Sequence, residues 1–246
     1  MIFVPCSNRS TSTKTMPVES KNIGTHSARM KAVTIHKLHT HFYGKSPGGL
    51  YIRHAERPEV ERHSTYNGLS PNGFVKALEA GEAIGGEWLL LHSPVMRCLQ
   101  TATCFGWGLA LAGGKGHPPI CESWLAGQLL YHDHDKAMDF LFRVGVQKFM
   151  IEWREGRIPS SIVSPIATVV REVAMRVRDV LQKARCPALM VTHDINILHF
   201  TQAAGIPFEK HSQPDFMDGV SVDLTDSGLR ISHWLSTSPS EALIVC

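Results

Sequence analysis

The chain lacks any apolar run approaching the roughly 18 residues that a membrane-spanning helix requires. Its apolar start, residues 1–6, is too short for the hydrophobic core of a signal peptide, and no basic residue precedes it. The six cysteines are scattered and form no CxxC pair, so the sequence predicts free thiols instead of disulfides. We therefore expect a soluble, cytoplasmic protein with no membrane partner.

Acidic residues are scarce at the start of the chain. Residues 1–45 contain seven Lys/Arg and one acid, so the remainder, with eighteen bases and twenty-one acids, carries a balance of −3. Such a body does not offer the basic surface that nucleic-acid binding needs, and no nucleic-acid partner is expected. Residues 1–30 are rich in Ser, Thr, Asn and Lys and predict a flexible basic tail. The alternatives for this segment are an extension ahead of a start at Met30 or an organelle transit peptide.

Apolar segments alternate with helical patterns from residue 48 onward, and 246 residues suffice for one sizeable domain, expected at 31–246. Short apolar strands are predicted at 48–54, 88–92 and 188–192, and a closing hairpin at 220–234. Helices are predicted at 72–85, from about 95, at 133–155 and at 165–184, with 113–119 as an irregular connection. For the first helix, Ser70 is the expected N-cap and Pro71 the first helical residue. The alternation indicates an α/β fold, a three-layer α/β/α sandwich with a mainly parallel sheet.

Polar motifs follow each of the three apolar strands. The strands run into Arg53-His54-Ala55-Glu56-Arg57, His92-Ser93-Pro94 and Thr192-His193-Asp194. Two arginines beside a histidine at the end of a buried strand are costly unless an anion neutralises them. Guanidinium forks match the oxygens of phosphate, and a neutral imidazole has a nitrogen that can attack phosphorus. With Arg97 one turn into the next helix, the motifs predict a site for phosphoryl transfer.

Four blocks in order along the chain carry a family resemblance. They are Tyr51-Ile-Arg-His-Ala-Glu56, Leu69-Ser-Pro-Asn-Gly73, His92-Ser-Pro-Val-Met-Arg-Cys-Leu-Gln-Thr-Ala102 and Val191-Thr-His-Asp194. Over about residues 48–235 the chain resembles the histidine phosphatase superfamily, which contains phosphoglycerate-mutase-like enzymes and histidine acid phosphatases. The resemblance implies a phosphoglycerate-mutase-like fold and a metal-independent phosphomonoester hydrolase acting on a small phosphorylated metabolite, with no cofactor.

The resemblance also assigns roles within the site. His54 would form a covalent phosphohistidine, and His193 would stabilise the transferring group. The expected phosphate ligands are Arg53, Arg57, Arg97 and His193. Ala55 stands where the family often has glycine, and it requires a backbone with negative φ. We expect Glu56 to pair with the arginines and orient them.

Two carboxylates are candidates for the proton donor to the leaving group. In the acid-phosphatase branch, the aspartate after the second histidine has this role, which corresponds to Asp194. In the mutase-like branch, a glutamate after a middle strand has it, and Glu122 matches that position. Asp194 could instead cap the helix that follows it. Arg57 favours the first branch, and the short segment between Arg97 and His193 favours the second.

Other functions remain open at this point. A phosphoglycerate-mutase-type phosphotransferase, a protein phosphohistidine phosphatase and a catalytically silent phosphate-binding module would all carry these residues. A cap or insertion expected at about 133–165 argues against the open site that a protein substrate needs. Two histidine groups, His36/His39/His41 and His132/His134, suggest a metal site, but no second pair at a matching spacing accompanies them, so surface or loop positions are expected.

Overall fold

The structure is a computed structural model, and it describes residues 48–59, 65–203, 214–233 and 241–244. The tail expected at residues 1–30, the histidines of 36–41 and the start of the expected domain lie outside these residues. Among the described residues, no helix combines the length and the hydrophobicity needed to cross a bilayer.

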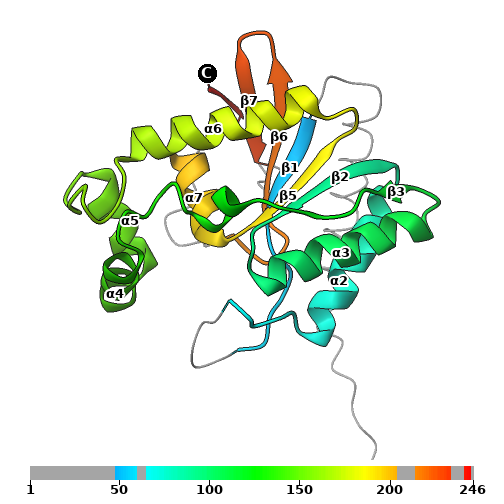
Figure 1. Cartoon of the computed structure of the whole chain (residues 1–246), viewed down its shortest axis with the longest axis horizontal. Coiled ribbons are helices and arrows are strands. Elements are labelled where there is room, and N and C mark those ends of the chain that lie inside the picture. Colours follow the sequence, from blue (N-terminus) through cyan, green and yellow to red (C-terminus); the bar gives the residue numbers. More distant parts are fainter. Residues whose placement is uncertain (1–47, 60–64, 204–213, 234–240, 245–246) are drawn as a thin grey trace, which may run out of the picture.

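One sheet forms the centre of the described part of the chain (Figure 1). Its parallel middle consists of β2 (Glu87–His92), β5 (Ala188–Thr192) and β1 (Gly48–Arg53), side by side in that order. Next to β2 lie the short parallel strands β3 (Lys115–Gly116) and β4 (Ile120–Cys121). β3 falls within the connection 113–119 that was expected to be irregular, and β4 follows it directly. On the other side, β6 (Gly219–Thr225), β7 (Gly228–His233) and β8 (Glu241–Ile244) are antiparallel. The predicted strands and hairpin are confirmed, whereas β3, β4 and β8 were not predicted.

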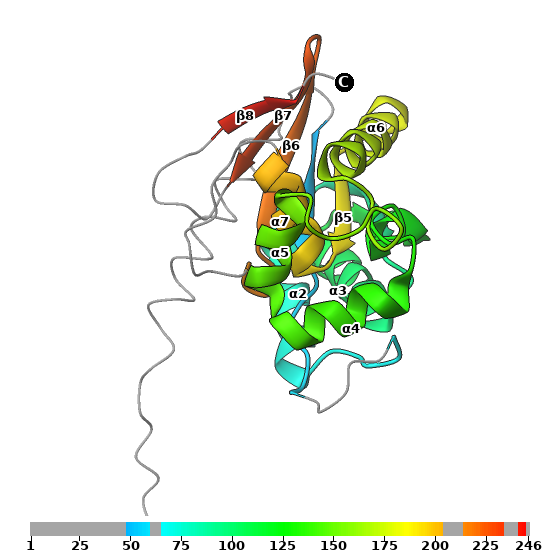
Figure 2. The same cartoon turned by 90° about the vertical axis from the view of Figure 1, so that its left-hand side faces the viewer.

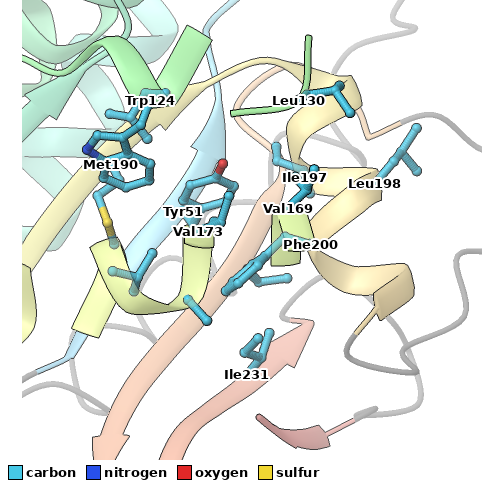
Figure 3. Packing of buried hydrophobic residues seen from close by; sticks show 14 of the residues in the cluster. Tyr51, Trp124, Leu130, Val169, Val173, Met190, Ile197, Leu198, Phe200 and Ile231 are labelled. Atoms are coloured by element: carbon cyan, nitrogen blue, oxygen red, sulfur yellow. The ribbon is translucent and has the colours of Figure 1, made fainter. Parts of the chain in front are cut away.

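The side chains of β1 alternate between two hydrophobic clusters, one on each face of the sheet. Leu50 and Ile52 pack with residues of α2 (Pro71–Ile84) and α3 (Met96–Leu111). Tyr51 points to the opposite face and packs with residues of α6 (Ile166–Lys183) and α7 (Asp194–Ala203), as Figure 3 shows for Val169, Val173 and Phe200. Because strand neighbours point to opposite faces, this alternation produces the three layers expected from the sequence.

The start of α2 follows the predicted capping pattern. Ser70 is the N-cap, its hydroxyl accepts a hydrogen bond from the backbone N–H of Gly73, and Pro71 is the first helical residue. Further along, α2 lies against α3 at glycines. A Cβ on Gly81 would collide with the carbonyl of Phe105, and one on Gly108 would collide with the backbone of α2. The two helices can therefore approach only because these side chains are absent.

The helical prediction for 133–155 is confirmed by α4 (His134–Val144) and α5 (Val146–Arg154). Both lie to one side of the sheet, with α5 next to α7 (Figures 1 and 2). Trp153 of α5 is buried, and its ring centroid lies 4.2 Å from that of His199 in α7. A short 3-10 helix, η1 (Ser123–Ala126), follows β4. Through Trp153, the helical segment of α4 and α5 is therefore packed into the main core and is not a separate body.

Candidate active site

The three polar motifs meet at the carboxyl ends of β1, β2 and β5. His54 follows β1, and its backbone N–H donates to the carbonyl of Thr192 at the end of β5. The backbone N–H of Ser93, after β2, donates to the carbonyl of Val191. The ring centroids of His54 and His193 lie 5.5 Å apart. Parallel strands place their carboxyl ends at one edge of a sheet, and this brings together residues that are more than a hundred positions apart in the sequence.

His54 is held as a neutral imidazole with a defined tautomer. Its side chain is only 3% exposed. Nε of Arg97 donates to Nε2 of His54 over 2.9 Å, and a guanidinium can only donate, so Nε2 carries no proton. The ring proton is then on Nδ1, which donates to the carbonyl of Ala55 over 2.7 Å. Burial, followed by the charges of His193, Arg97 and Arg53, lowers the pKa of His54 to about 2. The imidazole therefore keeps a lone pair on the nitrogen that faces the arginine.

The backbone around His54 is fixed by neighbouring elements. The N–H of Ala55 donates to the hydroxyl of Thr101 in α3 over 2.9 Å. Among the described residues, Met217 is the non-glycine residue with a positive φ, so Ala55 has the negative φ that was expected of it. The ring of His54 thus projects from a rigid loop.

Arg53 has two of its three nitrogens engaged. Nη1 donates to the carbonyl of Pro214 over 2.5 Å, and Nη2 lies 3.2 Å from Oδ2 of Asp194. The guanidinium carbon lies 4.3 Å from the ring centroid of Phe216. Nε of Arg53 is buried and has no hydrogen-bond partner among the described residues. A buried N–H without a partner is costly, so this donor is open to an anion.

Arg97 connects the two histidines. Besides its bond to His54, its Nη2 lies 3.4 Å from Nδ1 of His193. On its other edge, His193 lies with Nε2 3.0 Å from the hydroxyl of Ser93. Burial lowers the pKa of both Arg97 and Arg53, which means that the protein environment disfavours these two cations. A bound anion would offset that cost, as expected of a phosphate-binding site.

The two candidate proton donors are placed differently. Asp194 is the first residue of α7 and contacts Arg53; its Oδ1 also accepts from the N–H of Ile195 over 2.8 Å. Glu122 follows β4, and its backbone N–H donates to the carbonyl of His92 over 2.8 Å. This bond brings Glu122 to the same edge of the sheet. Within the described part of the chain, the Glu122 side chain forms no hydrogen bond or ion pair with the histidines and arginines of the site.

Arg57 interacts with the arginines of the site, whereas Glu56 forms its hydrogen bonds elsewhere. Arg57 is half-buried; its Nη1 contacts the carbonyl of Pro58, and its charge is felt by both Arg53 and Arg97. The expectation that Glu56 pairs with the arginines is wrong. Its carboxylate accepts from the hydroxyl of Ser70 over 2.6 Å and from the amide of Asn72 over 2.5 Å. Glu56 therefore belongs to the start of α2, because the loop after His54 runs across that helix terminus.

The loop before β6 was missed by the sequence analysis. Phe216 lies over Arg53, and its ring centroid is 5.8 Å from that of His54. The next residue, Met217, has φ of 63°, and its N–H donates to the carbonyl of His54. Such a conformation costs of order 1–3 kcal/mol and persists only where surrounding contacts fix it. The available signal was positional: because β6 is antiparallel to β1, its first residues must lie where β1 ends.

No cluster of potential metal ligands occurs among the described residues. No three His, Cys, Asp or Glu side chains there are grouped as a metal site would require. Nε2 of His132 lies 2.9 Å from the hydroxyl of Ser164, and His134 is largely exposed beside Asp135. Both are loop or surface positions, as expected.

Comparison with known proteins gave matches among solved structures alone, since no protein-family model and no curated protein matches the sequence. A mycobacterial glucosyl-3-phosphoglycerate phosphatase is 13% identical with a TM-score of 0.51, over 78% of this chain and 100% of its own. The phosphoglycerate mutase of Bacillus anthracis is 12% identical with a TM-score of 0.51, over 76% and 91%. A phosphoserine phosphatase variant of Entamoeba histolytica, in complex with phosphoserine, is 17% identical with a TM-score of 0.50, over 78% and 95%. The likeness confirms that this chain has the phosphoglycerate-mutase-like fold.

Proposed function

We propose that this protein is a phosphomonoester hydrolase that works through a covalent phosphohistidine on His54. The observation that carries the proposal is the state of that residue: a buried, neutral imidazole whose Nε2 lone pair faces the guanidinium of Arg97. Support comes from proteins of the same fold, which include two phosphatases and a mutase named for phosphorylated metabolites. We propose a small phosphorylated metabolite as the substrate and the cytoplasm as the location.

In the first step, Nε2 of His54 attacks phosphorus as the bond to the leaving oxygen breaks, and a carboxylic acid protonates that oxygen. In the second step, water attacks the phosphohistidine and gives its proton to the same carboxylate, which frees the imidazole and releases phosphate. Arg53, Arg57 and Arg97 would hold the phosphoryl oxygens, with His193 as a further donor. Three guanidinium groups supply the positive charge that a divalent ion supplies in other phosphatases, so the proposed reaction is metal-independent.

We assign the proton-donor role to Glu122 and a positioning role to Asp194. Both oxygens of Asp194 are engaged, one by the guanidinium of Arg53 and the other by a backbone N–H. Glu122 lies at the same edge of the sheet, is half-buried and has no cation bound to it among the described residues. Asp194 would then hold Arg53 in the orientation that leaves Nε open.

The test is hydrolysis of p-nitrophenyl phosphate in excess chelator by the wild type and by His54→Ala. The matched control is His117→Ala, which removes a surface histidine paired with Glu87. Wild type and control should release phosphate equally, and His54→Ala should lose at least about a thousandfold in kcat, as is usual for loss of a nucleophile. Mass spectrometry under neutral quench should find the phosphoryl group on His54. Full activity of a folded His54→Ala would refute the mechanism, and transfer to an added acceptor without phosphate release would identify a mutase.

A further inference from the structure

Polar groups on both edges hold the ring of His193. Ser93, fully buried at the end of β2, places its hydroxyl 3.0 Å from Nε2. Nη2 of Arg97 lies 3.4 Å from Nδ1. Because a guanidinium can only donate, Nδ1 is the accepting nitrogen, and the proton of the neutral ring is on Nε2. The Nε2–H group therefore donates to Ser93.

The hydroxyl of Ser93 has its own partners. It accepts from the backbone N–H of Val95 over 3.4 Å, and Sγ of Cys98 lies 3.7 Å from the same Nε2 of His193. The Cys98 thiol in turn donates to the carbonyl of Thr192 over 3.6 Å. A hydroxyl has one hydrogen and two lone pairs. One lone pair of Ser93 accepts from Val95, and the second accepts the Nε2–H of His193.

Charged and titratable groups face His193 from each neighbouring element. They are Arg53 and His54 at the end of β1, Arg97 and Cys98 in α3, and Asp194 directly after it in the chain. Burial and then Arg97 and Arg53 lower the pKa of His193 to about 3, so the ring is neutral. An anion bound between Arg97 and Nδ1 would act in the opposite direction, because a nearby negative charge favours the protonated imidazole.

We propose that Ser93 is a positioning residue for His193, holding Nε2–H so that Nδ1 faces the phosphoryl site and takes up one proton as the anion binds. The inference rests on the proposed function. The proton comes from the O–H of a phosphoryl monoanion, which becomes the dianion, or from water when a dianion binds, which releases hydroxide to the solvent; in each case an O–H bond breaks and an N–H bond forms at Nδ1. Nε2 keeps its own proton throughout and continues to donate it to the hydroxyl of Ser93. The resulting imidazolium then donates from Nδ1 to a phosphoryl oxygen.

Nitrogen-15 NMR of the histidine side chains, with inorganic phosphate as the titrant, tests this directly. Without phosphate, His193 should show the Nε2–H tautomer, assigned by comparison with His193→Gln. Saturating phosphate should convert it to the doubly protonated form. Ser93→Ala should give a mixture of tautomers and bind phosphate about tenfold more weakly, the size expected for one lost hydrogen bond. The control is Thr103→Ala, which removes a hydroxyl bonded to Leu99 within α3.

A second variant separates positioning from general damage. Ser93→Thr keeps the hydroxyl and should restore both the tautomer and the phosphate affinity, with thermal unfolding followed for every variant. A folded Ser93→Ala with the wild-type tautomer and affinity would overturn the proposal, as would a His193 that stays neutral in saturating phosphate. The NMR measurements do not require turnover. A wild type that hydrolyses no phosphomonoester would therefore count against the proposed function, while the role of Ser93 is decided by the spectra.

Discussion

Nε of Arg97 lies 2.9 Å from Nε2 of His54, so a guanidinium N–H occupies the lone pair of the proposed nucleophile. In the proposed reaction the attack on phosphorus needs that lone pair, so Arg97 would first have to turn its donor toward the phosphoryl oxygens. Substrate binding would then free Nε2 of His54 in the same step, because the N–H of Arg97 leaves that nitrogen as it binds a phosphoryl oxygen.

Removal of Arg97 should therefore have two opposite effects. Arg97→Ala is expected to lower kcat/KM by about 10²–10³-fold, the range for one lost donor to a transferring group. It should also raise the rate at which diethyl pyrocarbonate modifies His54, because the lone pair is no longer occupied. Peptide mass spectrometry gives that rate, with Arg171→Ala on the exposed face of α6 as the control. Unchanged modification of His54 would contradict the masking role of Arg97.

The choice of proton donor should be visible in the dependence on the leaving group. Glu122→Gln is expected to reduce hydrolysis of an alkyl phosphate by about 10²–10⁴-fold and that of p-nitrophenyl phosphate much less, because a nitrophenolate leaves without being protonated. Asp194→Asn should affect both substrates equally and mainly through KM, since it acts through Arg53. Steady-state kinetics on the two substrates measures both effects. If Asp194→Asn, and not Glu122→Gln, lost more activity on the alkyl phosphate, Asp194 would be the proton donor.

Glu56→Ala should change stability more than catalysis. The variant removes the acceptor of Ser70 and Asn72 at the start of α2, so a loss of about 1 kcal/mol in the free energy of unfolding is expected. Urea denaturation measures it, with Glu79→Ala, an exposed residue paired with Lys76, for comparison. kcat should stay within about threefold of the wild type. A loss of phosphate affinity in Glu56→Ala would restore the expectation that Glu56 orients the arginines.

Three histidines with lowered pKa values make the fold sensitive to acid. Burial lowers the pKa of His54 to about 2 and those of His193 and His199 to about 3, while all three titrate near 6.5 in the unfolded chain. The unfolded state thus binds more protons below about pH 6.5, and stability falls as the pH drops toward 3. Each histidine should add about 1.4 kcal/mol per pH unit to that slope. Urea denaturation between pH 7 and 5 should show a slope that is smaller by one such contribution in His199→Gln than in the wild type.

Much of the fold could be predicted because its signals are local. The helix at α6 carries Val169, Val173 and Val177 on one buried face, as its spacing indicated, and Ser70-Pro71 marked the start of α2. The ends of the three parallel strands located the candidate site. Parallel strands with helical crossovers leave few ways to place their carboxyl ends, so His54, Arg97 and His193 were expected to meet.

What could not be predicted depends on the direction of single side chains and on strand pairing. Glu56 turns toward Ser70 because the loop after His54 crosses the α2 terminus so closely that Gly73 has no room for a Cβ. Phe216 reaches Arg53 because β6 pairs with β1 in the antiparallel sense, and no local pattern gives that sense. The two strands β3 and β4 are only two residues long, which is too short for any period to show.

The glycine contact between α2 and α3 sets where this scaffold can be redesigned. Gly81 and Gly108 let the backbones of the two helices lie in close contact, and α3 supplies Arg97. Any larger side chain at either glycine would push α3 away from α2. It would thereby displace Arg97, the proposed phosphate ligand, without contacting it. Engineering of substrate preference should therefore leave this pair unaltered and vary α4 and α5, which lie away from the contact between α2 and α3 (Figure 1).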